Sequence, residues 1–407
     1  MAKSFLGSNT DSVDAFLQGT TSVFTNKRPV KLANMFMRHE DTSALGSNAW
    51  GQDHTFEPPL ACDFLGRCDL IIKTAAATST AATGNYPRFI DWIGYLAYDE
   101  VSVKFASNQL QRFSGLDAYI VDLVSLRSED SNAIVASGGL SAATRATNAA
   151  TANFEIICPL NLLFWVQKAA NYLPYNVEVL RRPLAIMVSL KTVYKVIETD
   201  GTDLAQAINS FVLRSENYHV TQSERKTLYR EVTEGYDEST ATTGWSRMVR
   251  LVEPHSDITL SGVTTAQEVR LTQLRLPTRE ILSVYRAEAD LASGALDATI
   301  QPTNFQAITN HRLQGYNENI HPSFSDKYNT HIMNRSHSGP LGSNVYTSCL
   351  SLLPESCEQF GYLNFSTVAL PTEEITLAGA THINKHITVP TLGVVNLLGG
   401  DLRMLFA

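Results

Sequence analysis

The sequence has little charge, few cysteines and no long apolar run. Charged residues make up 18% of its 407 residues, against ~25% in a typical soluble protein. No stretch approaches the ~18 uninterrupted apolar residues of a membrane-spanning helix. The first residues, Met1–Gly7, lack the apolar segment of a signal peptide. We therefore expect the cysteines to remain reduced and to pack as small hydrophobic side chains. They are Cys62, Cys68, Cys158, Cys349 and Cys357.

The balance of charge is acidic. Lysine and arginine number 32 and aspartate and glutamate 40, which gives a net charge of −8. A protein that binds nucleic acid through its phosphates needs a basic surface, so we expect no direct sequence-specific binding of nucleic acid. The 44% apolar content excludes a disordered chain, and the length favours two domains.

Sequence motifs of catalysis are also missing. There is no phosphate-binding glycine loop and no GxSxG element. His331 and His337 are too far apart to be ligands on neighbouring strand positions, and their surroundings indicate an exposed segment. His382 and His386 have the spacing of metal ligands on a helix, but their neighbours favour a strand. We expect no catalytic, cofactor-binding or metal-binding residues, no cofactor and no enzyme activity.

Short alternating runs indicate β-strands. Residues 100–105 and 184–190 alternate apolar and polar side chains, and residues 176–179 and 269–272 do so over shorter lengths. Further strands are expected near 281–285, 345–353, 368–377 and 389–398. One helix is predicted from about 114 to 124, where Ser114 and Asp117 form a cap-like start. We expect this helix to cover the open end of a sandwich.

Long stretches of small and polar residues separate these runs. The Ala/Thr-rich tracts 74–84 and 141–151 are interpreted as loops, as are 287–303 and 312–343. Loops of this length usually have a function, and because they recur in both halves, we expect them to form the outer or contacting surface of a sandwich.

The fold class predicted is all-β, with two consecutive eight-stranded jelly-roll sandwiches and a few short helices in the loops. Two such rolls need about 90 strand residues, which is close to the usual strand content of a chain this long. The expected division is an N-terminal arm at 1–22, a first jelly roll at 23–205 and a second at 206–407.

Several segments of the first half resemble a known family, the double jelly-roll major capsid proteins of nucleocytoplasmic large DNA viruses (of iridoviruses, asfarviruses and phycodnaviruses). They are residues 66–70 (GRCDL), 93–103, 107–116 (SNQLQRFSGL), 159–165 (PLNLLFW) and 173–176 (LPYN). Cys68 stands where the family has a glycine, and Val177 where an acidic residue is common.

The second half is similar to the same family, in the same order. The matching segments are residues 276–284 (LPTREILSV), 346–355 (YTSCLSLLPE), 361–366 (GYLNFS) and 394–400 (VVNLLGG). Thr367 and Val368 stand where the family usually has arginine and aspartate, and Ser283 replaces a bulky aromatic residue.

The resemblance implies a structural function. It implies a homotrimeric capsomer whose six sandwiches form a pseudo-hexagonal tile of an icosahedral shell around double-stranded DNA. The implied partners are further copies of the chain, minor capsid and penton proteins, and an inner viral membrane. The implied location is the virion, after assembly in the host cytoplasm or nucleus.

Two alternatives remain open at this stage. One is a jelly-roll scaffolding protein of immature particles, which the sequence does not separate from a shell protein. The other is a cupin-like or lectin-like jelly roll that binds a metal or a carbohydrate.

Overall fold

A computed structural model describes most of the chain. The described residues are 35–80, 82–125, 141–160, 172–220, 225, 245–253, 255–274, 276–287, 303–316, 318–333, 337, 344–352, 354, 361–379, 383–398 and 401–404. The expected N-terminal arm at 1–22 lies outside these residues.

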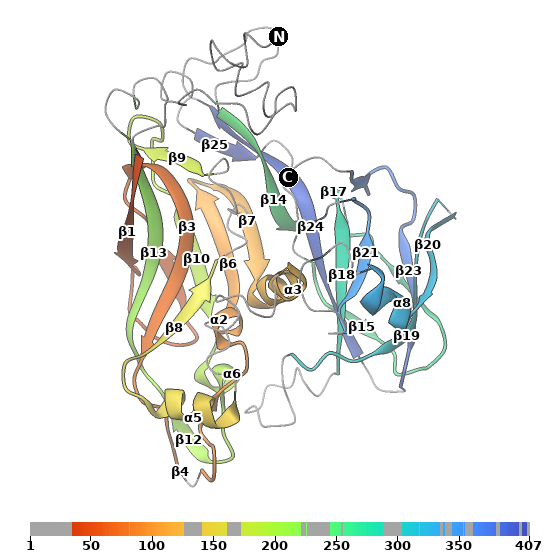
Figure 1. Ribbon diagram of the computed structural model, residues 1–407, viewed down its shortest axis with the longest axis horizontal. Coiled ribbons are helices and arrows are strands. Elements are labelled where there is room, and N and C mark those ends of the chain that lie inside the picture. Colours follow the sequence, from red (N-terminus) through yellow and green to blue (C-terminus); the bar gives the residue numbers. More distant parts are fainter. Residues whose placement is uncertain are drawn as a thin grey trace, which may run out of the picture.

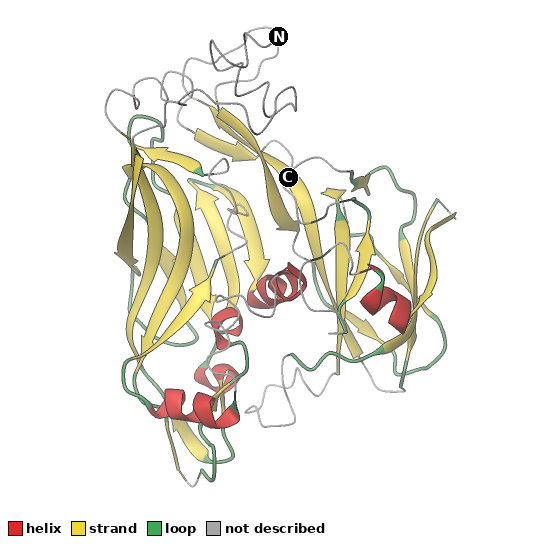
Figure 2. Ribbon diagram, in the orientation of Figure 1, coloured by secondary structure: helices red, strands yellow, loops and turns green. Residues whose placement is uncertain are grey.

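The first half forms a sandwich of two antiparallel sheets (Figures 1 and 2). One sheet has the order β1 (Met35–Ser43), β13 (Ile208–Val220), β3 (Ala61–Thr74) and β8 (Phe154–Pro159), with β9 (Leu173–Asn176) also paired to β3. The opposite sheet has the order β2 (Asp53–Phe56), β10 (Ala185–Leu190), β6 (Tyr98–Phe105) and β7 (Asn108–Ser114). The alternating segments at 100–105 and 184–190 are therefore the adjacent strands β6 and β10.

The second half repeats this arrangement. Its first sheet contains β21 (Tyr346–Cys349), β18 (Glu280–Ala287) and β24 (Ile383–Leu398), and β14 (Trp245–Glu253) and β15 (Ile258–Leu260) both pair with β24. Its opposite sheet has the order β16 (Gln267–Arg270), β23 (Thr372–Leu377), β19 (Ile308–Gly315) and β20 (Glu318–Ser325). The short strands β17 (Pro277–Thr278), β22 (Leu363–Asn364) and β25 (Asp401–Met404) extend the first of these sheets.

The order of strands is the same in both sandwiches. The eight principal strands of the first half are β1, β2, β3, β6, β7, β8, β10 and β13, and those of the second half are β14, β16, β18, β19, β20, β21, β23 and β24. When each set is numbered one to eight along the chain, one sheet has the order first, eighth, third and sixth. The other sheet contains the second, seventh, fourth and fifth. This arrangement is the jelly roll, and its repetition confirms the predicted fold class of two consecutive jelly rolls.

The strand pairing corrects one domain boundary. β13 pairs with β1 and with β3 along its length, so residues 208–220 complete the first sandwich. The boundary expected between 205 and 206 is therefore too early. We propose that the first domain ends after Val220 and that the second begins before Trp245.

The predicted helix is present as α3 (Gly115–Ser125). Its start is capped as expected, because the backbone N–H of Asp117 donates to Ser114 Oγ at 3.0 Å and Asp117 accepts from the Ser114 backbone at 2.9 Å. Figure 1 places α3 between the two sandwiches, beside β7 and β24. Its position is therefore a junction between the sandwiches, whereas a cover over one open end was expected.

Three segments interpreted as loops contain regular structure. The tract 141–151 is the helix α5 (Ala142–Ala150), whose Ser141 side chain caps the backbone N–H of Thr144 at 3.1 Å. Alanine favours helix, and serine is a preferred N-cap, which explains the difference. The expected loop at 312–343 includes the end of β19, all of β20 and the helix α8 (Asp326–His331). In tract 74–84, residues 78–80 form the short strand β4, and most of 287–303 lies outside the described residues.

The remaining short elements are β5 (Arg88–Phe89), α2 (Ile93–Leu96), α6 (Val193–Val196), β11 (Ile197–Glu198) and β12 (Thr202–Ala205). Of these, α2, α6 and β12 lie toward the lower end of the first sandwich in Figure 1, and β11 pairs with β5.

The apolar interior forms two clusters. One fills the first sandwich and continues into side chains of β14, β24 and β25 in the second half, including Val249, Leu251, Val395 and Leu402. The other fills the second sandwich. The two sandwiches are thus joined by a continuous apolar contact.

The cysteines in the described residues are unbridged. Cys62, Cys68 and Cys158 are buried, as expected, and burial raises the pKa of Cys62 to about 12. Cys349 is partly exposed, and Cys357 lies outside the described residues.

Candidate functional site

The junction between the sandwiches is built around α3. The side chain of Tyr119 on α3 contacts the ring of Phe305 from the second half, with ring centroids 6.1 Å apart. The long strand β24 contributes side chains to both apolar clusters. Ile387 and Val389 belong to the cluster of the second sandwich, and Val395 and Leu397 belong to that of the first. The relative placement of the sandwiches is therefore set by buried contacts.

A glycine allows α3 to approach the first sandwich closely. A Cβ atom at Gly115 would lie 2.2 Å from the carbonyl oxygen of Tyr95 and 2.6 Å from that of Tyr98. Both obstacles are backbone atoms, so a side chain at this position would displace the start of α3. Packing of α3 against the first sandwich therefore requires a glycine at position 115.

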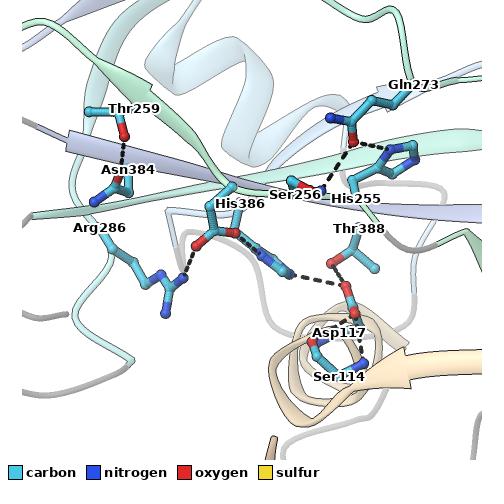
Figure 3. Close-up of polar contacts among 11 residues, drawn as sticks. Ser114, Asp117, His255, Ser256, Thr259, Gln273, Arg286, Asn384, His386 and Thr388 are labelled. Atoms are coloured by element: carbon cyan, nitrogen blue, oxygen red, sulfur yellow. Dashed lines mark hydrogen bonds and ion pairs between the residues drawn. The ribbon is translucent and has the colours of Figure 1, made fainter. Parts of the chain in front are cut away.

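A buried imidazole connects the two sandwiches (Figure 3). His386 on β24 donates from Nε2 to Asp117 Oδ1 of α3 at 3.0 Å and from Nδ1 to Asp257 Oδ1 at 2.7 Å. Thr388 donates to the same oxygen of Asp117 at 2.7 Å, and Arg286 donates to Asp257 Oδ2 at 2.7 Å. Asp117 belongs to the first half, and its partners His386 and Thr388 belong to the second.

The carboxylates keep His386 protonated. Burial alone would lower the pKa of His386, but the charges and hydrogen bonds of Asp117 and Asp257 raise it to about 9. Burial alone would raise the pKa of Asp117, but the charge of His386 and the hydrogen bonds from His386, Thr388 and Ser114 hold it below its usual value. At neutral pH the group is a buried cation between two carboxylates, which is an electrostatic link between the domains.

A second polar network crosses the interior of the second sandwich. Glu373 on β23 forms an ion pair with Lys385 on β24 and a hydrogen bond with His311 on β19, and all three side chains are at most 2% exposed. Asn329 of α8 extends this hydrogen-bond network. It hydrogen-bonds to His311 at 3.2 Å and accepts from the backbone N–H of Thr347 at 2.8 Å. Burial lowers the pKa of Lys385 well below that of a solvated amine.

The histidines considered as metal ligands have separate positions. His386 lies on a strand, as expected, and His382 lies outside the described residues. His331 ends α8 and is exposed. His337 differs from the expectation of an exposed segment, because its side chain is 1% exposed and its Nε2 lies 3.0 Å from Glu280 Oε2. Sequence spacing could not indicate this contact, since the two residues are far apart along the chain.

Large apolar side chains are exposed at two places that could contact other subunits. The strand β1, which ends the order of its sheet, exposes Phe36 and Met37. In the second half, loops near 350–371 expose Leu352 and Leu370, at 81% and 66%. Other exposed apolar residues, such as Val177 and Val263, lie singly in other segments.

Among the described residues, no helix combines the length and apolar character needed to cross a membrane.

The chain is similar to solved structures of viral capsid proteins. A structure of the PBCV-1 virus capsid has a TM-score of 0.72 at 13% identity and covers 95% of this chain and 100% of that one. The Faustovirus major capsid protein has a TM-score of 0.68 at 12% identity, with coverage of 96% and 94%. The Sputnik virophage structure has a TM-score of 0.56 at 10% identity, with coverage of 95% and 91%. No protein-family model and no curated protein matches the chain.

These similarities are structural and extend over nearly the whole chain. They establish the double jelly-roll fold that viral major capsid proteins have, in agreement with the strand order described above.

Proposed function

We propose that this protein is a capsid subunit of an icosahedral double-stranded DNA virus, with a structural rather than an enzymatic function. The observation that carries the proposal is the repetition of one eight-strand order in a single chain. The similarity of fold to major capsid proteins over 95% of the chain supports it. A fold by itself does not determine function, but the duplication has a physical consequence that suits a shell.

A duplicated sandwich provides two similar building units with one fixed relationship. Three chains arranged around a threefold axis would then present six similar sandwiches, which gives a pseudo-hexagonal outline. A unit with nearly sixfold edges can tile a flat facet by repeating one type of lateral contact. Closed rotational symmetry is the usual arrangement of homo-oligomers.

The junction suits this mechanical task. The apolar contact across α3 is buried, and so are His386 and Asp117 of the ion group, while Asp257 lies at its solvent side with a side chain 36% exposed. Inter-domain surfaces that are small and polar allow domains to move, whereas an apolar interface restrains them. We infer that the two sandwiches act as one rigid block in the shell.

The surfaces proposed for subunit contacts are those with exposed apolar or irregular structure. They are the edge strand β1, the region of α5, and the loops at 350–371 with Leu352 and Leu370. Contacts of the trimer with neighbouring capsomers, with minor capsid and penton proteins and with an inner membrane are further parts of the proposal. The N-terminal segment 1–22 is proposed as an arm on the underside of the shell.

The first experiment is the molar mass of the purified full-length protein by light scattering. The proposal predicts a stable particle of three 44.8 kDa chains. A monomer that binds a carbohydrate or another small ligand would contradict it and would favour the lectin-like alternative.

The second experiment separates a shell protein from a scaffold. Quantitative mass spectrometry of mature particles should find the chain as an abundant component if it forms the shell. Its presence in immature particles and absence from mature ones would favour the scaffolding alternative.

A further inference from the structure

Three side chains with metal-binding atoms converge in the second sandwich. Glu280 on β18 and Cys349 on β21 are directly opposite each other in the antiparallel pairing. His337 approaches from a separate segment, with its Nε2 3.0 Å from Glu280 Oε2. One ligand atom from each residue, a carboxylate oxygen, an imidazole nitrogen and a thiol sulfur, lies within 4.8 Å of the other two.

The surrounding structure holds two of these residues, Glu280 and Cys349, next to each other. The backbone N–H of Leu350 donates to the carbonyl of Arg279 at 2.8 Å, which extends the pairing of the two strands beside the cluster. The ring of His321 hydrogen-bonds to the backbone of Cys349. Directly opposed side chains on paired antiparallel strands are close neighbours, so Glu280 and Cys349 remain close together.

Burial makes the cluster different from a group of surface residues. The side chains of Glu280 and His337 are 0% and 1% exposed, while Cys349 is partly exposed. Two of the ligand residues thus have buried side chains, and the third, Cys349, is partly exposed. This leaves a direction from which an ion and a water molecule can enter.

The donor set selects the type of metal. Zinc binds thiolate, imidazole and carboxylate ligands at about 2.0–2.3 Å, whereas magnesium and calcium favour oxygen ligands. Those bond lengths in a tetrahedron place ligand atoms about 3.5 Å apart. Small side-chain rotations would bring the observed cluster to that geometry.

We propose that Glu280, His337 and Cys349 form a zinc-binding site. The three residues supply three ligands, and water supplies the fourth. Binding requires the thiol to lose its proton to solvent as the metal–sulfur bond forms. The ion would attach residue 337 to the β18–β21 strand pair and so stabilise this side of the second sandwich. This inference is independent of the proposed shell function.

The test uses the full-length protein and zinc alone. After treatment with a chelator, the protein is dialysed against zinc and the bound metal is measured by elemental analysis. We expect about one zinc per chain, as for a single site. Cys349→Ser and His337→Gln should each weaken binding by at least about tenfold, since even indirect changes around a metal have effects of that size.

The control is His331→Gln, which changes an exposed histidine of α8 and should bind zinc like the wild type. Equal zinc binding by wild type, Cys349→Ser and His337→Gln would overturn the proposal. So would the failure of the wild-type protein to bind zinc.

Cobalt provides a second readout, the first part of which needs only the wild-type protein. Cobalt bound to the wild-type protein through Cys349 should produce the near-ultraviolet charge-transfer absorption of a thiolate ligand. If this absorption is absent, or if it persists in a folded Cys349→Ser variant, the proposed site is wrong. Light scattering on the same samples reports assembly separately, so failure of the zinc site and failure of the capsid proposal are distinguishable.

Discussion

The two sandwiches share a strand order but differ in how their sheets contact each other. In the first, Phe211 of the eighth principal strand meets Phe56 of the opposite sheet edge-to-face, with ring centroids 4.9 Å apart. In the second, the eighth principal strand instead presents Lys385 to Glu373 of the opposite sheet. Both sandwiches have an apolar core, but the second adds a buried ion pair between its sheets where the first has an aromatic contact.

The comparison shows that the topology tolerates different interior chemistry. Apolar contact stabilises a sandwich without strict requirements on direction. A buried ion pair is different, because each charge loses its hydration and depends on its partner. We therefore expect the second sandwich to be the more sensitive to changes of single charged residues.

The largest effect is expected from Lys385→Met. The change leaves the buried carboxylate of Glu373 without its cationic partner, and we expect the free energy of unfolding to fall by about 3–5 kcal/mol. The double variant Lys385→Met/Glu373→Gln should recover most of this loss, because the amide oxygen can still accept from His311. Urea unfolding measures both values.

Lys327→Met is the control for that experiment. Lys327 is exposed on α8, so the change should alter stability by no more than about 0.5 kcal/mol. If Lys385→Met were as stable as this control, the buried pair would not have the importance assigned to it.

The next largest effect concerns pH and the junction. Because the pKa of His386 is raised to about 9 in the folded protein, from about 6.5 when unfolded, its contribution is complete below pH 6.5. The contribution is lost as the pH rises through 9. The difference corresponds to roughly 3 kcal/mol. Unfolding measured between pH 6 and 10 should show this decline for the wild type and a smaller one for His386→Gln.

The acid side of the profile has the opposite sign. The pKa values of Asp117 and Asp257 are lowered in the folded protein, so their contributions are present above the unfolded value near 3.9. These contributions are lost as the pH falls through the lowered values.

Identical alkaline profiles for the wild type and His386→Gln would show that the junction does not depend on this ion group.

A smaller effect is expected from Gly115→Ala. The added methyl group would meet the carbonyl oxygens of Tyr95 and Tyr98, and displacement of α3 should destabilise the protein by about 1–3 kcal/mol. Gly379→Ala is the matched control, because a Cβ there meets no atom within 4 Å. Thermal unfolding of the two variants distinguishes close packing from a general effect of replacing glycine.

The smallest effect is expected at the surface of the first sandwich. Arg214 and Asp41 form a two-point ion pair at 2.7 and 2.8 Å, but the side chains are 42% and 44% exposed. Arg214→Gln should therefore cost no more than about 1 kcal/mol. The cost should shrink further at high salt, because salt screens exposed charges. A loss as large as that of Lys385→Met would remove the distinction between interior and surface charges.

Local elements were predicted correctly where the sequence pattern is compatible with a single kind of secondary structure. Alternation identified β6 and β10, and the Ser114–Asp117 cap identified α3. The helix α5 was missed, although Ser141 before an alanine-rich run is a helix-start signal. The many small and polar residues of this tract favour a loop, but the Ser141 cap and the helix propensity of alanine outweigh them.

Contacts between distant segments could not be predicted in the same way. The side chains of Asp117 and His386 meet across 269 residues of sequence, and alternation indicates the face of a strand but not its partner. The boundary error has the same cause, because β13 returns to lie between β1 and β3. Lys385 did carry a signal, since it shares a strand face with the buried Ile383 and Ile387.

A single-particle electron microscopy map of the purified full-length protein would show directly whether the chain forms the proposed capsomer. We expect a ring of three chains with six sandwiches, a pseudo-hexagonal outline and α3 buried between the two sandwiches of each chain. A map of isolated monomers, or of an assembly in which the two sandwiches of a chain occupy variable positions, would contradict it.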